Sequence, residues 1–301
     1  MGIGDDGAVV QTDPNEHTIL VTDTMVSGVH FPERTAPQDL GYKLLAVNLS
    51  DLAAMGATPS WFLLNLVIPD ADETWLEEFS TGLFSLAEEF GLELIGGDTA
   101  RGPLCLSATV GGHVKSGTAL MRNGAQAGDE LWVSGTLGDA AIGLDLVDGV
   151  PGANDNDMDY LVGRLNRPIP RIDLGLSLGG VATAVVDISD GLLADLGHIL
   201  RESGALGAIV DVSCLPLSPQ AIGVCGESLA RQKALAVRSS RSSGLLGGTG
   251  IWSGLFAGSA RYAWDCRGDT IGVPSACVVA RGVSGLCAGI YSGCCICGYC
   301  C

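Results

Sequence analysis

The sequence has 301 residues, which is enough for one large domain or for two ordinary domains with buried cores. Its formal net charge is −18, and neither nucleic acid nor an anionic membrane is expected as a partner, because both are themselves negative. Met1 is followed directly by "GIGDDGAVV" rather than by a basic and then apolar stretch, so no signal peptide is expected and a cytoplasmic location is predicted.

The residues up to 235 alternate short β-branched stretches with longer helical patterns, which predicts a mixed α/β (α+β) protein. Helices are expected over 37–57, 73–91 and 190–204. Strands are expected over 17–24, 92–97, 104–114, 130–135, 183–189 and 207–213. Glycine, asparagine and aspartate cluster over 115–129, which predicts a boundary between two domains, 1–115 and 116–235.

Aspartates flanked by Gly, Ser or Thr stand at the ends of several of these apolar stretches. In α/β folds the loops that leave the carboxyl ends of strands converge on ligands, and small neighbours let a phosphate or an ion approach the backbone. Several carboxylates with few basic partners gather only where cations neutralise them, and Mg²⁺ binds through a few carboxylates together with substrate phosphates. The aspartates concerned are Asp5, Asp6, Asp23, Asp51, Asp98, Asp187 and Asp190.

Structural roles compete with functional ones for these side chains. Asp190 fits a helix N-cap as well as it fits a metal ligand. Asp51 lies inside a largely apolar helix, where an unpaired carboxylate is costly, so a ligand role is favoured for it, as it is for Asp98. Arg122 fits either a phosphate contact or a surface residue, and His30 fits either a packed or capping histidine or a substrate contact. The residues by themselves predict Mg²⁺-dependent handling of a phosphorylated ligand.

Several motifs carry a family resemblance: "GIGDDGAVV", "TDTMVSGVHF", "YKLLAVNLSDLAAMGATP", "LIGGDTARGPL" and "DISDGLLADLGHI". From residue 2 to about 235 the sequence resembles the thiamine-monophosphate kinase family, which belongs to the aminoimidazole ribonucleotide synthetase (PurM-like) superfamily. The resemblance implies a two-domain PurM-like fold, an active site between the domains and a homodimer formed through the N-terminal strands. It also implies direct in-line transfer of the γ-phosphoryl group of ATP to thiamine phosphate, with Mg²⁺, to give thiamine diphosphate.

The resemblance further implies roles for individual residues. By matching position, the Mg²⁺ ligands would be Asp6, Thr22, Asp23, Asp51, Asp98, Asp187 and Asp190. ATP would be contacted by Gly97, Asp98, Arg122 and Ser189, and thiamine phosphate by His30. Residues 1–115 would bind ATP and Mg²⁺ and form the dimer, and residues 116–235 would bind the second substrate. Members of the family carry a further segment before the "GIGDD" motif, so an N-terminal segment is expected to be missing here.

Residues 236–301 differ in composition from the rest of the chain. Up to Leu235 there are 11 Lys and Arg against 32 Asp and Glu, whereas the tail has five Arg, two Asp and no Lys or Glu. Eight of the eleven cysteines lie in this tail, and the family's glycine-rich acidic motif does not appear in it. We interpret the tail as the product of a frameshift near Leu235. An incomplete C-terminal domain and a loss of activity in this chain are therefore expected.

Other interpretations compete with this one. Another enzyme of the superfamily, of the selenophosphate or aminoimidazole ribonucleotide synthetase type, would share the fold, although the context of "TDTMVSGVHF" argues against it. Alternatively, the chain is an inactive scaffold with a metal-binding tail, because Cys294, Cys297 and Cys300 have zinc-knuckle spacing. The absence of a second cysteine pair disfavours that role. Residues 282–301 carry no charge and could span a bilayer by length, but Gly, Ser and Cys dominate them.

Overall fold

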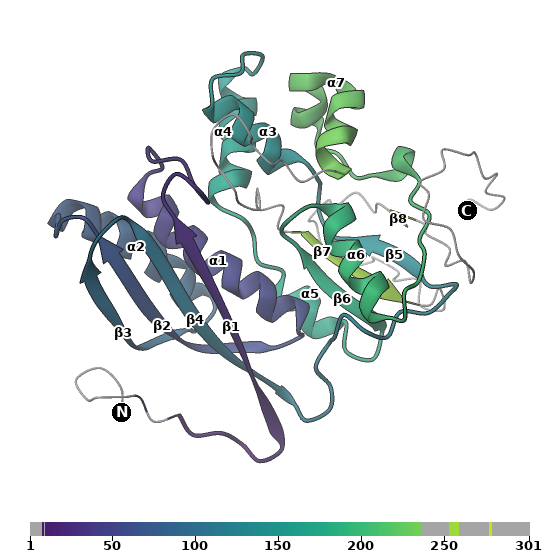
Figure 1. Cartoon of the computed structure of the whole chain (residues 1–301), viewed down its shortest axis with the longest axis horizontal. Helices are drawn as coiled ribbons and strands as arrows, with labels where there is room; N and C mark the ends of the chain where they lie inside the picture. Colours follow the sequence, from purple (N-terminus) through teal and green to yellow (C-terminus); the bar gives the residue numbers. More distant parts are fainter. Residues whose placement is uncertain (1–7, 9, 236–252, 259–276, 279–301) are drawn as a thin grey trace.

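Two sheets with helices packed against them make up the described part of the chain, which is residues 8, 10–235, 253–258 and 277–278 of this computed structural model (Figure 1). The first sheet contains, in spatial order, β1 (Glu16–Val26), β4 (Cys105–Lys115), β2 (Thr58–Ile68) and β3 (Glu93–Arg101). The second contains β6 (Ala182–Ile188), β7 (Ser253–Gly258), β5 (Glu130–Val133) and β8 (Cys277–Val278). Among the described strands, β2 and β3 pair in parallel and the other pairs are antiparallel.

Two helices, α1 (Pro37–Ala54) and α2 (Glu73–Glu89), pack on one face of the first sheet. Pro37 occupies the first turn of α1, where its fixed φ suits a helix start. Gly56 follows the helix with a φ of 66°, which lets the chain turn away. The two helices touch backbone to backbone, because a Cβ atom on Gly41 of α1 would lie 2.0 Å from the carbonyl oxygen of Phe79 on α2. This close packing holds α1 in place over the sheet.

The strands of the first sheet alternate between this helical side and an open outer face. On β1, Val21 and Met25 pack against the core, whereas Leu20, on the opposite face, is 62% exposed. The hydroxyl groups of Thr24 and Ser107 meet on that outer face at 2.8 Å. Among the described elements, no helix covers this face in Figure 1.

Helices enclose the second sheet differently on its two sides. Ala184, Val186 and Ile188 of β6 share a core with Leu196 of α6 (Leu192–Glu202). The intervening Val185 faces the other way, where it packs near α5 (Ile172–Ser177) and the C-terminal part of α1. A separate group of helices, α3 (Asp139–Val147), α4 (Asp155–Asn166) and α7 (Pro219–Leu235), packs together beside the sheet. In Figure 1, α1 and α5 lie between the two sheets.

The structure confirms the helices expected over 37–57, 73–91 and 190–204, but it differs at two strands. The expected strand over 207–213 is wrong, because no strand is described there. Ala208 and Val210 still pack against the second core, and Asp211 caps a short 3₁₀ turn, Val212–Cys214. The apolar pattern of this segment therefore reflects burial without strand pairing. The long strand β2, Thr58–Ile68, was absent from the expected set.

Part of the unusual tail takes a place in the second sheet. β7 lies between β6 and β5 and pairs with both of them. Residues of the tail therefore supply β7 and β8 of this sheet, because strand pairing uses backbone groups, which any sequence supplies. The cysteine cluster from Cys294 to Cys301, the uncharged stretch 282–301 and Asp6 lie outside the described residues. None of the described helices combines the length and the apolar character that crossing a membrane requires.

Candidate functional site

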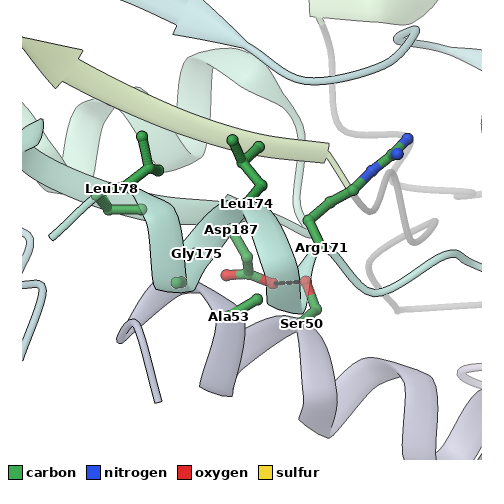
Figure 2. Close-up of a pocket in the computed structure, with 9 residues that line it drawn as sticks. Ser50, Ala53, Arg171, Leu174, Gly175, Leu178 and Asp187 are labelled. Atoms are coloured by element: carbon green, nitrogen blue, oxygen red, sulfur yellow. Dashed lines mark hydrogen bonds between the residues drawn. The ribbon is translucent and has the colours of Figure 1, made fainter. Parts of the chain in front are cut away.

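Asp187 is a buried carboxylate of the second sheet that faces helix α1. The alternation along β6 points Val186 and Ile188 toward α6 and turns Asp187 toward α1. There its Oδ2 accepts a hydrogen bond from the hydroxyl of Ser50 at 3.3 Å, as Figure 2 shows. Asp187 is 5% exposed and Ser50 is 7% exposed. This hydrogen bond therefore joins the first lobe, which is the first sheet with α1 and α2, to the second lobe, which is the second sheet with α3 to α7, in a site largely closed to water.

Three carboxylates converge around this contact. Burial raises the pKa of Asp51 to about 8, and the charges of Asp187 and Asp23 add to the effect. Burial likewise raises the pKa of Asp187, helped by the charges of Asp195 and Asp23. The pKa of Asp23 is also raised by burial, and His30 partly opposes that rise. The common cause is negative charge gathered where water solvates it poorly.

Arg122 supplies positive charge to this cluster, since its guanidinium group lowers the pKa of both Asp51 and Asp187. The backbone around Arg122 is held by the hydroxyl of Ser203, which donates to the Arg122 carbonyl oxygen at 3.2 Å. The same hydroxyl accepts from the amide groups of Gly124 and Ala125 at 3.2 and 3.1 Å. The loop that carries Arg122 is therefore anchored to the C-terminal end of α6.

His30 lies in a tight turn beside the same cluster. Its Nδ1 accepts a hydrogen bond from the Val26 amide at 3.0 Å. The attraction that His30 exerts on Asp23 shows that the two side chains are near each other. The hydrogen bond agrees with a packed or capping role for this histidine, and its contact with a substrate stays a prediction.

The loop Ser189–Gly191 after β6 is organised by a residue that the sequence analysis did not single out. One carboxylate oxygen of Asp195, in the first turn of α6, accepts from the amide groups of Ser189, Asp190 and Gly191 at 3.0, 3.1 and 3.1 Å. The N-cap of α6 is Gly191, so the N-cap role considered for Asp190 is wrong. Burial and the charge of Asp190 raise the pKa of Asp195 to about 6, although these hydrogen bonds oppose the rise.

Thr22 and Asp98 lie on the other face of the first sheet. Their placement follows from the register, in which Asp98 pairs with Asn65 and Asn65 pairs with Ser107 on the outer face. The hydroxyl of Thr22 is hydrogen-bonded to Thr109 at 3.1 Å across the sheet. Three strand spacings separate β1 from β3, which is about 14 Å. The structure therefore does not bring Thr22 and Asp98 into the carboxylate cluster.

Gly97, expected as an ATP contact, also has a structural reason to be glycine. It lies on β3 with a φ of 151°, and a Cβ atom there would lie 1.9 Å from the carbonyl oxygen of Leu64 on β2. Any larger residue would push β3 away from β2. The glycine is required by strand packing, whatever ligand the strand contacts.

The donor chemistry of the cluster suits a divalent cation held partly by the protein. Its ligands would be carboxylates, which are hard oxygen donors. Within the described ranges, no group of three or more His, Cys, Asp or Glu side chains is arranged to hold a metal ion by itself. This arrangement fits Mg²⁺, which commonly binds one or two carboxylates and completes its coordination with water and substrate phosphates. A spare oxygen donor lies one turn before Asp51, where the Oδ1 atom of Asn48 is buried without a partner.

A small apolar pocket borders the cluster (Figure 2). Ala53 of α1 forms one wall, and Leu174 of α5 and Leu178, which follows that helix, form another, with Ser50 and Asp187 at the polar end. The guanidinium group of Arg171 points away from Asp187 in this view. The apolar wall explains why Asp187 is so poorly solvated.

Comparison with known proteins places the chain in a family. Residues 4–119 match the family described as AIR synthase related protein, N-terminal domain. Thiamine-monophosphate kinase from Salmonella typhimurium is 49% identical over 218 residues, which cover 72% of this chain and 67% of that protein. The chain belongs to the thiamine-monophosphate kinase family. The mixed α/β architecture is accordingly that of the PurM-like superfamily.

Solved structures of this family share the architecture. Thiamine-monophosphate kinase from Stenotrophomonas maltophilia superposes with a TM-score of 0.80 at 43% identity, and the match covers 95% of this chain and 88% of that one. AaThiL complexed with AMPPCP and TMP superposes with a TM-score of 0.79 at 29% identity, over 96% of this chain and 87% of that one. The second structure shows that a relative of this fold binds an ATP analogue together with TMP.

Proposed function

We propose that this chain is built to transfer the γ-phosphoryl group of ATP to thiamine phosphate, with Mg²⁺, giving thiamine diphosphate and ADP. The observation that carries the proposal is the convergence of Asp23, Asp51 and Asp187 beside Arg122 in a member of this family. A phosphate oxygen of thiamine phosphate would form the new bond to the γ-phosphorus as the bond to ADP breaks. That oxygen is already ionised at neutral pH, so the reaction needs neither a general base nor a covalent enzyme intermediate.

The chain's own residues would contribute positioning and charge. Asp23, Asp51, Asp187 and Asp190 would be the carboxylates available to Mg²⁺, one or two to each ion, and bound Mg²⁺ would neutralise the charge that the phosphates bring. Arg122 would contact ATP and Ser189 would do so from the loop after β6. His30, next to Asp23, would contact the phosphate of the second substrate. Asp6, Thr22, Gly97 and Asp98 belong to the same proposal only through the family resemblance, since the described structure does not place them in the cluster.

Both lobes would take part in binding each substrate under this proposal. Arg122 and Ser189 of residues 116–235 would contact ATP beside the Mg²⁺ ligands of both lobes, and His30 of residues 1–115 would contact thiamine phosphate. The open outer face of the first sheet, with Leu20 62% exposed, would form a homodimer. An acidic chain that uses these small substrates would work in the cytoplasm.

An acceptor assay tests the proposed function. The chain is compared with a version whose reading frame is restored after Leu235, each with ATP, Mg²⁺ and thiamine phosphate, and thiamine diphosphate is measured by chromatography. We expect product from the restored version alone, and only when Mg²⁺ is present. ADP release by the restored version with another acceptor, but not with thiamine phosphate, would favour a different enzyme of the superfamily. Equal activity in both versions would contradict the frameshift interpretation of the tail's role.

A further inference from the structure

We propose that Asp195 is a positioning residue for the phosphate-binding side of the site, because it fixes the backbone of Ser189, Asp190 and Gly191. The inference rests on the proposed function, which gives Ser189 an ATP contact and Asp190 a metal ligand. Asp195 itself lies on α6, and its role is to hold the loop that carries those two residues.

The geometry explains why this carboxylate suits the task. Three consecutive amide groups point at a single oxygen, Oδ2 of Asp195, at 3.0 to 3.1 Å. Consecutive amides converge on one acceptor only when the loop is tightly curved, so the carboxylate selects one backbone conformation for the loop. Asp195 is 4% exposed, and water therefore cannot easily replace it as the acceptor.

The packing of α6 in the second core keeps Asp195, and with it the loop Ser189–Gly191, in a fixed position. Leu192, Leu196 and Ile199 of this helix are buried in the second core, so the helix that carries Asp195 is rigidly placed. Asp187, at the end of β6, lies only two residues before Ser189. The first amide group that Asp195 binds, that of Ser189, therefore lies two residues after the buried carboxylate of Asp187. A loop held in this way presents Ser189 and Asp190 in one arrangement instead of many, which reduces the entropy lost when a ligand binds.

The decisive variant is Asp195→Ala in the full chain, measured by binding of a fluorescent ATP analogue in the presence of Mg²⁺. We expect the dissociation constant to rise about 10- to 100-fold, which is the usual loss when a partner behind a metal ligand is removed. Amide hydrogen exchange at residues 189–191 should accelerate in the same variant. Asp195→Asn keeps an oxygen acceptor at the same place and should bind within about threefold of the unaltered chain.

Asp72→Ala is a matched control. Asp72 also accepts two backbone amides at a helix start, from Thr74 and Trp75 at 3.0 and 3.2 Å, but α2 contributes nothing to the cluster. This variant should lose stability without losing ATP affinity. If Asp195→Ala does not fold, Asp195→Ser replaces it, since a serine hydroxyl is too short to reach the three amides.

The outcomes separate the two proposals. A folded Asp195→Ala chain with unchanged ATP affinity and unchanged exchange at 189–191, beside normal binding by the unaltered chain, would overturn the role of Asp195 alone. No Mg²⁺-dependent ATP binding by the unaltered chain would overturn the proposed function, and the role of Asp195 with it. An equal loss of affinity in Asp72→Ala would show that helix destabilisation, rather than loop positioning, causes the effect.

Discussion

The charge of Asp51 should destabilise the fold when no cation is present, and Asp51→Asn should remove that cost. The pKa of this carboxyl group rises from an ordinary 3.8 to about 8. Below about pH 4 the group is protonated in the folded and the unfolded chain, so it costs nothing there. As the pH rises, the unfolded chain loses the proton near 3.8 while the folded protein keeps it until about 8. Stability therefore falls across this interval and levels off above it.

The size of the effect follows from the same pKa values. A pKa difference of one between the folded and unfolded states corresponds to about 1.4 kcal/mol of folding free energy. Because part of the shift of Asp51 is repulsion from Asp187 and Asp23, which can take up protons themselves, Asp51→Asn should stabilise the fold by roughly 2–4 kcal/mol at pH 8. In a chain of this size that corresponds to an unfolding midpoint about 3–6 °C higher. Near pH 4 the difference should vanish.

Thermal unfolding between pH 4 and 9, with a chelator present, measures this prediction. Asp159→Asn is the control, because Asp159 is an exposed residue of α4 and should leave the pH dependence unchanged. In a second series of measurements, Mg²⁺ should raise the unfolding midpoint of the unaltered chain at pH 8, and it should raise the midpoint of Asp51→Asn much less. A midpoint difference that does not change with pH would refute the reasoning, and so would equal stabilisation of both proteins by Mg²⁺.

Three further predictions concern the surroundings of the site. Ser203→Ala removes the hydroxyl that holds the backbone of Arg122, and a binding titration should show ATP affinity about three- to tenfold lower. Ser203→Thr keeps a hydroxyl and should retain most of the ATP affinity. Arg167→Ala breaks the 2.6 Å ion pair with Asp39 of α1, and because both side chains are partly exposed, urea denaturation should show a loss of only about 0.5–1 kcal/mol. A loss above about 2 kcal/mol would mean that this pair governs lobe packing. Leu20→Glu places a charge on the outer face of the first sheet, and light scattering should show a monomer in place of a dimer, with little change in the unfolding midpoint. If both proteins are dimers, the interface lies elsewhere.

Local patterns predicted the elements that carry the carboxylates. The helix around Asp51 has an apolar pattern and clear start and stop signals, and the strand before Asp187 has a continuous apolar run. Such signals are local, so they can be found without knowing the partner surfaces. The unpaired charge inside an apolar helix was also enough to identify Asp51 as unusual, and its raised pKa agrees with that interpretation.

The faces of the strands could not be predicted in the same way. The pairing of β2 with β3 shifts between Phe62 and Leu63, and an irregularity of this kind changes which side chains share a face with the core. Asp98 therefore lies on the outer face although it follows an apolar stretch, as Asp187 does. Asp195 was missed for a different reason. An aspartate within an amphipathic helix resembles a surface residue, and its role appears only when the preceding loop folds back over it.

The charge balance of the site depends on the packing of the two lobes, which no local pattern contains. Asp23 and Asp51 come from the first lobe and Asp187 from the second, and Arg122 arrives on the segment between the two sheets. Three carboxylates and one guanidinium group leave two negative charges in a poorly solvated place. One divalent cation would neutralise them, whereas the apo protein can do so only by keeping protons, which is why the pKa values of Asp51 and Asp187 are raised. Protons and metal therefore compete for the same carboxylates, so the affinity for Mg²⁺ should rise with pH up to about 8.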